Sequence, residues 1–463
     1  MAEPETASED VPVQAEKTLG LSADVVSSVT EALDDEHRFE SRLLVEELRA
    51  PELADLLQLL RPELRGRLVD YLRPDFDPEI LPELEDDVRN DVVEQLGTRA
   101  LARNIARLET DDALELISSL QEDQRRQVFQ AIPSALRATL QAGLAFPEDS
   151  AGRLMQRDFV VVPAFWSVGE TIDYLREADN LPNDFYDIFV IDPRHRAVGT
   201  VALSHVLRNK RPVKIIDITE PDLVTVSANM DQEDVAFLFG QQDLVSAPVV
   251  DEVGRLIGTI TVDDVLDVIQ EEAEEDIMRL GGVRTDDLYS AAIETGRSRF
   301  SWLFLNLITA ILASIVIGFF EGTLEQIVML AILMPIVASM GGNAGTQTMT
   351  VAVRALATKE LTGANAMRVI GKEVLVGIYN GFLFALLIGL VAWFWSGSWS
   401  IGMVMAVAMV ITLVLAALAG MLIPLGLSRT RIDPAIASGV FLTTITDVVA
   451  FSAFLGLAAW FLI

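Results

Sequence analysis

The sequence predicts a multidomain membrane protein in which an acidic, water-soluble half precedes an all-α half of five membrane spans. Residues 1–296 contain 27 Lys or Arg and 62 Asp or Glu, whereas residues 297–463 contain eight and six. The soluble half also repeats itself, because residues 188–207 align without gaps onto residues 247–266. Uncharged runs long enough for a helix to cross a bilayer of about 30 Å begin only after residue 299.

Residues 1–35 are expected to form a disordered acidic tail, because they begin MAEPETASEDVPVQAE, which is too polar for a signal peptide. Residues 36–150 are expected to form an N-terminal superhelix of short amphipathic helices. Leucines recur there at spacings of three and four, and Pro-Glu falls repeatedly at helix starts. Asp111 and Asp112 lie at one such start, where helix capping is the simplest explanation and a cation contact is the alternative.

The repeat predicts two α+β modules, residues 151–215 and 216–267, each with the order helix, strand, tight turn, strand, helix. This pattern strongly resembles a tandem pair of cystathionine-β-synthase (CBS) domains, which are regulatory modules. Thr261 and Asp264 match the Thr-x-x-Asp with which some CBS domains hold an adenosine ribose, and the resemblance makes ATP a candidate ligand. The first copy lacks both residues.

Residues 268–296 are expected to form an amphipathic connecting helix, which we call the plug helix. Eight acids and no base fall between Asp263 and Asp276, while apolar residues recur at helical spacing. A solvated acidic face is the usual explanation for such a run. We favour cation binding, because neighbouring carboxylates suit hard cations such as Mg²⁺.

Residues 297–463 are expected to form a transmembrane domain with five spans. Uncharged runs occupy 300–320, 326–353 and 374–428, the last of which holds two spans separated near Ser396–Ser400. With the soluble half in the cytoplasm, all eight Lys and Arg of this domain fall on the cytoplasmic side and the C-terminus lies outside.

Asp447 is the only charged residue between Asp433 and the end of the chain. It lies about 21 Å along the last span from Asp433, where an ionised carboxylate costs several kcal/mol unless it is compensated. Thr443 and Thr444 keep the same stripe polar. An ion pathway is the favoured explanation, and a structural aspartate bonded to neighbouring helices is the alternative.

The second span contains Pro335, three glycines and several amide and hydroxyl side chains. We expect a broken helix here, with Asn343 and Gln347 lining the same pathway as Asp447. Close packing of small residues against neighbouring helices is the alternative.

Several function classes do not fit this composition. The chain has no cysteine and three histidines, all in the soluble half, so no catalytic or soft-metal site is expected in the membrane. The acidic surface would repel nucleic acid, and an acid in the pathway opposes anion flow.

The order of these features resembles the MgtE family of magnesium channels and transporters over about residues 30–463. The motifs that carry the resemblance are GGNAGTQ at 341–347, TVDDVLDVIQEEAEEDI at 261–277, Asp433-Pro434-Ala435, and the Thr-x-x-x-Asp of 443–447. The resemblance implies a homodimer in the inner or plasma membrane of a bacterial cell, with a pore between the subunits and Asp447 facing the ion.

The resemblance also implies that high cytosolic Mg²⁺ closes the pore by binding acids outside it. The acids it implies are Glu272, Glu275 and Asp276 of the plug helix, Asp433, and Asp231, Glu233, Asp243, Asp264 and Asp267 of the CBS pair. A broader divalent cation transporter for Co²⁺ and Mg²⁺, with nucleotide regulation through the CBS pair, is the alternative.

Overall fold

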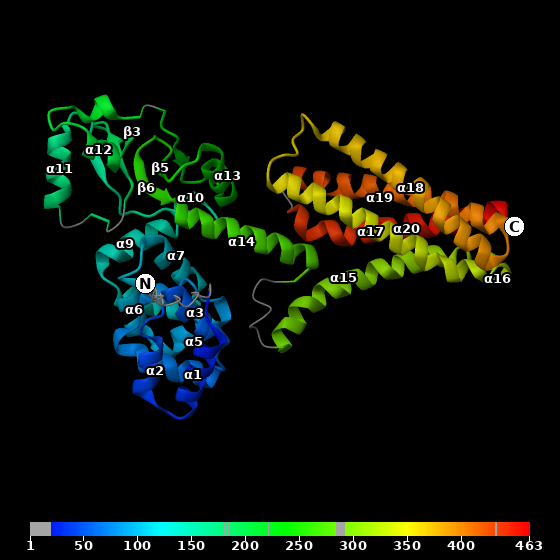
Figure 1. Cartoon of the computed structure of the whole chain (residues 1–463), viewed down its shortest axis with the longest axis horizontal. Helices are drawn as coiled ribbons and strands as arrows, with labels where there is room; N and C mark the ends of the chain where they lie inside the picture. Colours follow the sequence, from blue (N-terminus) through cyan, green and yellow to red (C-terminus); the bar gives the residue numbers. More distant parts are fainter. Residues whose placement is uncertain (1–19, 179–180, 183–184, 221, 284–291, 431–432) are drawn as a thin grey trace, which may run out of the picture. The chain divides into compact units, whose positions relative to one another are not determined.

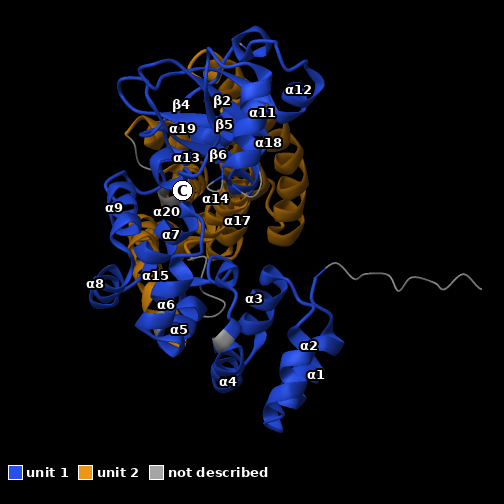
Figure 2. Ribbon diagram, turned by 90° about the vertical axis from the view of Figure 1, so that its left-hand side faces the viewer, with its two compact units in different colours: residues 1–266 blue, residues 267–463 orange. Residues whose placement is uncertain are grey.

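The computed structural model describes residues 20–463 except 179–180, 183–184, 221, 284–291 and 431–432 (Figure 1). The chain forms two compact units, residues 1–266 and 267–463, which Figure 2 colours separately. Unit 1 holds a helical N-terminal domain followed by two small α+β domains. Unit 2 holds most of the plug helix and five long apolar helices.

The prediction of a disordered tail to residue 35 is wrong for its last part, because α1 (Ala23–Asp34) is a helix. Ser22 accepts a hydrogen bond from the Val25 N–H and caps it, and Val29 and Leu33 are fully buried one turn apart. The acids that follow the helix concealed this apolar spacing in the sequence. Residues 1–19 lie outside the described residues.

Short helices make up the rest of the N-terminal domain, as predicted. They are α2 (Arg38–Val45), α3 (Ala50–Leu59), α4 (Pro62–Leu72), α5 (Asp86–Leu96), α6 (Thr98–Ile105), α7 (Thr110–Ser119), α8 (Glu122–Ala131) and α9 (Ser134–Gly143), with 3₁₀ turns at Arg73–Asp75 and Pro78–Ile80. Proline begins or nearly begins α3 and α4, where its missing N–H leaves no helical bond unmade. The recurring leucines of the sequence form the buried side of these helices.

The two α+β domains have the same topology, and each contains a three-stranded sheet with the order first-second-third strand. The first domain contains α10 (Ala151–Leu154), β1 (Val161–Pro163), α11 (Val168–Glu177), β2 (Asp187–Ile191), β3 (Ala197–Ala202) and α12 (Leu203–Arg208), and the 3₁₀ turn Ile215–Ile218 follows it. The second contains β4 (Val226–Ser227), α13 (Gln232–Gln242), β5 (Ser246–Val250) and β6 (Leu256–Thr261). In each sheet the first two strands are parallel and the last two antiparallel.

The turns between the last two strands show how closely the two copies correspond. His195 and Gly254 occupy the same position of the two turns and have φ angles of +59° and +80°. An aspartate precedes each turn and accepts backbone N–H bonds from it: Asp192 from Arg194 and Arg196, and Asp251 from Val253 and Arg255. The internal repeat of the sequence is therefore a repeat of structure.

The plug helix is α14 (Val262–Gly281), so its predicted bounds of 268–296 are wrong at both ends. It begins earlier because Asp264 accepts hydrogen bonds from the Thr261 hydroxyl and N–H, which caps the helix. It ends at Gly281, and Gly282 follows with φ +67°, a conformation that glycine adopts without strain. Residues 284–291 lie outside the described residues, and 292–296 belong to the next helix.

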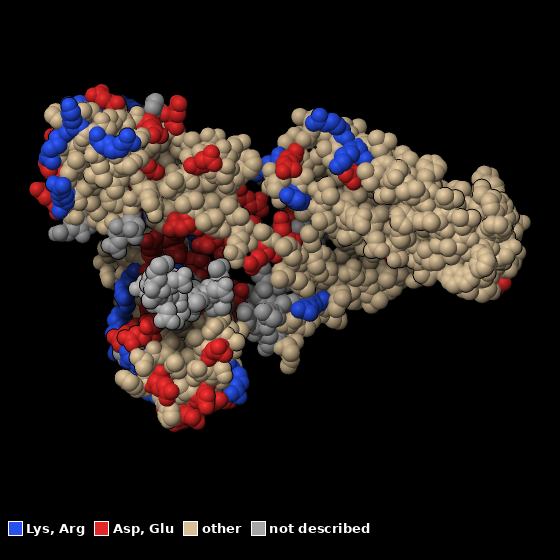
Figure 3. Space-filling model, in the orientation of Figure 1, with Lys and Arg blue, Asp and Glu red and all other residues tan. Residues whose placement is uncertain are grey.

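Five helices of unit 2 are long and apolar enough to cross a membrane, which confirms the predicted number within the part of the chain described. They are α15 (Ala292–Gly318), α17 (Met329–Ala357), α18 (Ala366–Ser396), α19 (Trp399–Arg429) and α20 (Pro434–Phe461); the short α16 (Glu321–Gln326) follows the first. The central helix is α19, which packs along α17, α18 and α20. The Lys and Arg side chains visible on unit 2 gather at one end of the bundle (Figure 3).

The expectation of a broken second span is wrong, because α17 runs without interruption through Pro335 and the glycines. The glycines instead allow helices to approach closely. A Cβ on Gly341 would lie 2.6 Å from Thr412 Cγ2 of α19, and one on Gly345 would lie 2.9 Å from Leu442 Cδ1 of α20. Packing from these neighbours holds a helix that proline alone would weaken.

Candidate ion-binding sites

Asp447 lies half-buried at the middle of α20, the helix that forms the last span. Within the described chain it has neither a hydrogen-bond nor an ion-pair partner. The neighbouring hydroxyls do not compensate it, since Thr443 and Thr444 donate to the carbonyls of Gly439 and Val440 on their own helix. A structural role for Asp447 through bonds to other helices of the same protomer therefore has no support here, and the carboxylate is free to meet water or a cation.

Asn343 and Gln347 lie on the exposed side of α17, opposite the glycines that contact α19 and α20. Neither amide bonds to Asp447 in the described protomer. Exposed amides in a membrane span need another polar surface, such as a second subunit or a water-filled path. Their part in the ion pathway stays a prediction.

A second cluster of acidic residues lies inside unit 2, where the end of the plug helix contacts the residue that precedes the last span. Arg279 Nη1 lies 2.5 Å from Asp433 Oδ2, and its other amino group pairs with Glu275. Burial and the charges of Asp433 and Glu272 raise the pKa of Asp276, an effect that Arg279 opposes. Three of the acids expected to bind Mg²⁺, Glu275, Asp276 and Asp433, thus already interact with one guanidinium that supplies positive charge to them.

A third acidic group lies within unit 1, where the start of α7 meets the start of α14. Electrostatic repulsion acts on Asp111, Asp112 and Asp264, from one another or from Glu109. Asp264 also accepts a hydrogen bond from the Gln156 amide at 3.2 Å. One carboxylate oxygen of Asp111 is buried with no hydrogen-bond partner, although its position at a helix start would allow one.

These carboxylates carry an electrostatic cost that a cation would relieve. Burial, followed by repulsion from neighbouring acids, raises the pKa of Asp112 to about 7 and that of Asp111 well above its ordinary value. Burial is also the main cause that raises the pKa of Asp264 to about 6. No group of three or more His, Asp or Glu is arranged to hold a metal in the described ranges, so a cation would have to draw these acids closer together.

The raised pKa values predict how the stability of unit 1 depends on pH. A carboxyl whose pKa is raised by folding favours the folded state while protonated, so stability should fall as pH rises from about 4 to about 7. We expect a loss on the order of 2 kcal/mol at neutral pH for Asp112, allowing for its partial exposure. Thermal unfolding of the full chain in chelator at pH 5 and pH 7.5 would measure it.

The matched variants for this experiment are Asp112→Asn and Asp123→Asn, since Asp123 is an exposed aspartate at the start of the next helix. Asp112→Asn should reduce the difference in stability between the two pH values by about 2 kcal/mol, and Asp123→Asn should leave it unchanged. Mg²⁺ added at pH 7.5 should stabilise the unaltered chain more than Asp112→Asn. Equal behaviour of the two variants would contradict an electrostatic cost at Asp112.

Of the remaining acids expected to bind cations in the CBS pair, Asp231 and Asp243 have structural roles in this conformation, and Glu233 is exposed. Asp231 caps α13 and accepts from the Glu233 N–H, and Asp243 ends that helix with φ +50°. Asp267 is exposed on α14. Thr261 and Asp264 are bonded to each other, so an adenosine ribose would have to replace that bond, and ATP binding stays a prediction.

Sequence reasoning missed three residues that these sites involve. Glu109 precedes Asp111 by two residues and contributes to the cost in unit 1. Arg279 lies just after the acidic run, so the run itself contains no base that would indicate an ion pair. Glu373 of α18 is buried in the membrane half, with 7% of its surface exposed, and its only signal in the sequence was an acid bordering a long apolar run.

Comparison with known proteins identifies the family. A model described as divalent cation transporter (MgtE) matches residues 334–457, one for the MgtE intracellular N domain matches 48–149, and one for the CBS domain matches 215–271. The magnesium transporter MgtE of Thermus thermophilus is 32% identical over 439 residues, which cover 93% of this chain and 97% of that protein. The protein of the same name from Bacillus subtilis is 29% identical over 422 residues, 91% and 94% of the two chains.

Two solved structures are similar to about half of this chain. The soluble part of a magnesium transporter is 27% identical with a TM-score of 0.48, covering 54% of this chain and 98% of that one. The cytosolic domain of the Mg²⁺ channel MgtE in complex with ATP is 29% identical with a TM-score of 0.49, covering 52% and 99%. On the extent and identity of the match to full-length relatives, this chain belongs to the MgtE family of divalent cation transporters.

Proposed function

We propose that the protein carries Mg²⁺ into the cytoplasm and that cytosolic Mg²⁺ closes it. The observation that carries the proposal is Asp447, a carboxylate in the last span of a divalent cation transporter with no partner among the described residues. Relatives that span almost its whole length are named magnesium transporters, which supports Mg²⁺ as the ion. Mg²⁺ loses its water reluctantly, so Asp447 would recognise an ion that keeps most of its hydration shell.

The proposal includes a homodimer with the pore between subunits, the soluble half in the cytoplasm and the C-terminus outside. The exposed amides of α17 support the dimer, because a second subunit would cover them. The eight Lys and Arg of the membrane half support the orientation. Closure follows if Mg²⁺ binds the acids of unit 1 and of the plug helix more tightly in the closed state than in the open state.

Uptake into liposomes by the purified protein tests the transport proposal. We expect Mg²⁺ uptake to exceed Ca²⁺ uptake by at least about tenfold, because selection by a hydrated shell disfavours a larger ion that dehydrates easily. Co²⁺ uptake at the Mg²⁺ rate would favour the broader divalent transporter. The proposal would be contradicted if the liposomes transported no divalent cation in either orientation of the protein.

A further prediction concerns Arg279, which holds the plug helix to the last span in the absence of bound metal. Arg279→Gln removes the positive charge shared by Glu275 and Asp433, so these acids repel and the contact weakens. We expect higher channel activity in Mg²⁺-free solution and closure by Mg²⁺ that is retained. Patch-clamp recording would measure both.

Arg279→Lys is the matched control, because it keeps the charge and loses the two-pronged geometry of arginine. Its channel activity in Mg²⁺-free solution should lie between that of Arg279→Gln and that of the unaltered chain. Unchanged activity of both variants in Mg²⁺-free solution would show that this ion pair has no part in gating.

A further inference from the structure

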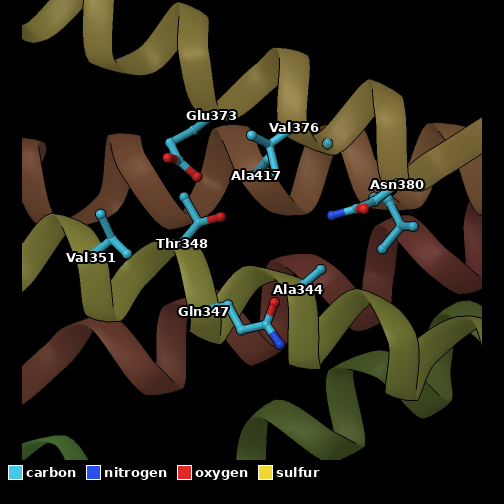
Figure 4. A pocket seen from close by; sticks show the side chains of 10 residues that line it. Ala344, Gln347, Thr348, Val351, Glu373, Val376, Asn380 and Ala417 are labelled. Carbon is cyan, nitrogen blue, oxygen red and sulfur yellow. The ribbon is translucent and has the colours of Figure 1, made fainter.

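A partly open cavity with several polar side chains in its lining lies in the membrane half, apart from Asp447. The helices α17 and α18 both pack along α19 and touch each other little, which leaves a space of about 120 Å³ between them. Its polar lining consists of Gln347 and Thr348 from α17 and of Glu373 and Asn380 from α18. In Figure 4, Glu373 and Thr348 point toward one another across this space, and Gln347 and Asn380 border it.

Glu373 is the unusual member of this lining, because a carboxylate buried among membrane helices is costly unless it is compensated. Only 7% of its surface is exposed. Glu373 Oε1 lies 3.5 Å from Lys372 Nζ, and the Lys372 side chain is 71% exposed. Such an exposed lysine is a weak partner that can leave at little cost. The carboxylate therefore needs water or a cation in the cavity.

The helical register explains why the cavity collects oxygen ligands. Glu373, Gly377 and Asn380 are spaced by four and three residues, so they share the face of α18 that turns to α17 and α19. Gly377 lets this face approach α19, since a Cβ there would lie 3.1 Å from the Leu413 carbonyl oxygen. One carboxylate, two amides and one hydroxyl are the oxygen donors that hard cations prefer.

The size of the cavity favours a hydrated ion over a bare one. A space of about 120 Å³ is several times what one water molecule needs, so an ion can keep several waters there. Mg²⁺ takes six oxygen ligands and commonly keeps several waters while binding one or two protein oxygens. The Glu373 carboxylate and one oxygen from Thr348, Gln347 or Asn380 would supply the protein ligands, and waters would complete that number.

We propose that this cavity is an accessory divalent cation site inside each protomer, held by Glu373 and distinct from the site at Asp447. Lys372 neutralises Glu373 while the site is empty and is displaced when the cation enters. The bound ion joins α17 to α18, so it restrains the helix that carries Asn343. The identity of the ion as Mg²⁺ rests on the proposed function, whereas the existence of the site does not.

A cysteine reporter tests the site, because the native chain contains no cysteine. Ala344→Cys places a thiol in the cavity lining, where a small polar methanethiosulfonate reagent should modify it in the purified full chain. Mg²⁺ should slow this reaction. Thr350→Cys, on the exposed side of α17 outside the cavity, should show no effect of Mg²⁺.

Three further variants in the Ala344→Cys background assign the effect to Glu373. Glu373→Gln should raise the half-protecting Mg²⁺ concentration by at least about tenfold, since the charged ligand is lost. Lys372→Gln should lower it by about threefold, because a weak competing ion pair is removed. Asp447→Asn should leave it unchanged, which separates the cavity from the pore.

Equal protection in the Glu373→Gln and unaltered backgrounds would overturn the proposal, and so would equal protection by Na⁺ at the same concentration. Crystals soaked in Mn²⁺ give a second measurement, in which an anomalous peak between α17 and α18 is expected and should vanish in Glu373→Gln. These are binding measurements, so they stand even if liposome uptake fails. A failed cavity test likewise leaves the transport proposal intact.

Discussion

Asp447→Ala is expected to abolish Mg²⁺ uptake while the protein remains folded and inserted. The carboxylate has no partner in the described protomer, so its removal breaks no internal bond and should cost little stability. Asp447→Asn is the sharper test, because it preserves side-chain size and the ability to hydrogen-bond to the water of a hydrated ion. It removes only the charge, and we expect uptake in liposomes to fall by at least about tenfold.

Glu321→Gln is the matched control for Asp447→Asn, because it neutralises an exposed acid of the same domain that lies outside the last span. Glu321 is the first residue of α16. It should keep most of the uptake, and both variants should elute from size-exclusion chromatography as the unaltered protein does. Normal uptake by Asp447→Asn would mean that the charge of this residue is not what the ion meets.

Much of the fold could be predicted because its signals are local. The aligned repeat gave the two α+β domains, and the uncharged runs gave five spans. The errors also have local causes. Pro335 and the glycines of α17 favour a break when considered alone, but Thr412 and Leu442 pack against those glycines from other helices. In α1 the apolar stripe is short and has acidic residues on both sides. Only the burial of its side chains in the structure shows that the stripe belongs to a packed helix.

Among the candidate sites, one could also be predicted from a local signal in the sequence and two could not. Asp447 could be predicted because it is a single charge in a long apolar run. The group formed by Asp111, Asp112 and Asp264 joins parts of the chain that are about 150 residues apart, and each aspartate has a sufficient local explanation as a helix cap. Glu373 was concealed by its neighbour Lys372, which made the pair look like the charged border of a span.

The second large effect is expected from neutralising three acids of the plug helix together, Glu272→Gln, Glu275→Gln and Asp276→Asn. These changes remove the mutual repulsion of the acids and also remove ligands through which Mg²⁺ would bridge the plug helix to Asp433. The two effects oppose each other. Because Arg279 already offsets part of the repulsion at Glu275 and Asp433, loss of the ligands should dominate. The variant should therefore conduct at internal Mg²⁺ concentrations that close the unaltered channel.

Patch-clamp recording over a range of internal Mg²⁺ measures this, and we expect the half-closing concentration to rise by at least about tenfold. Glu271→Gln with Glu274→Gln is the control, since both acids are exposed on the same helix and their loss changes the net charge in the same direction. In the proposed dimer the two soluble halves together carry about seventy uncompensated negative charges. Salt screens the repulsion only between charges that are more than about 8 Å apart. If closure depended on that general repulsion alone, the control would behave like the triple variant. Closure that shifts in the triple variant and not in the control would instead assign it to ligands at these three positions.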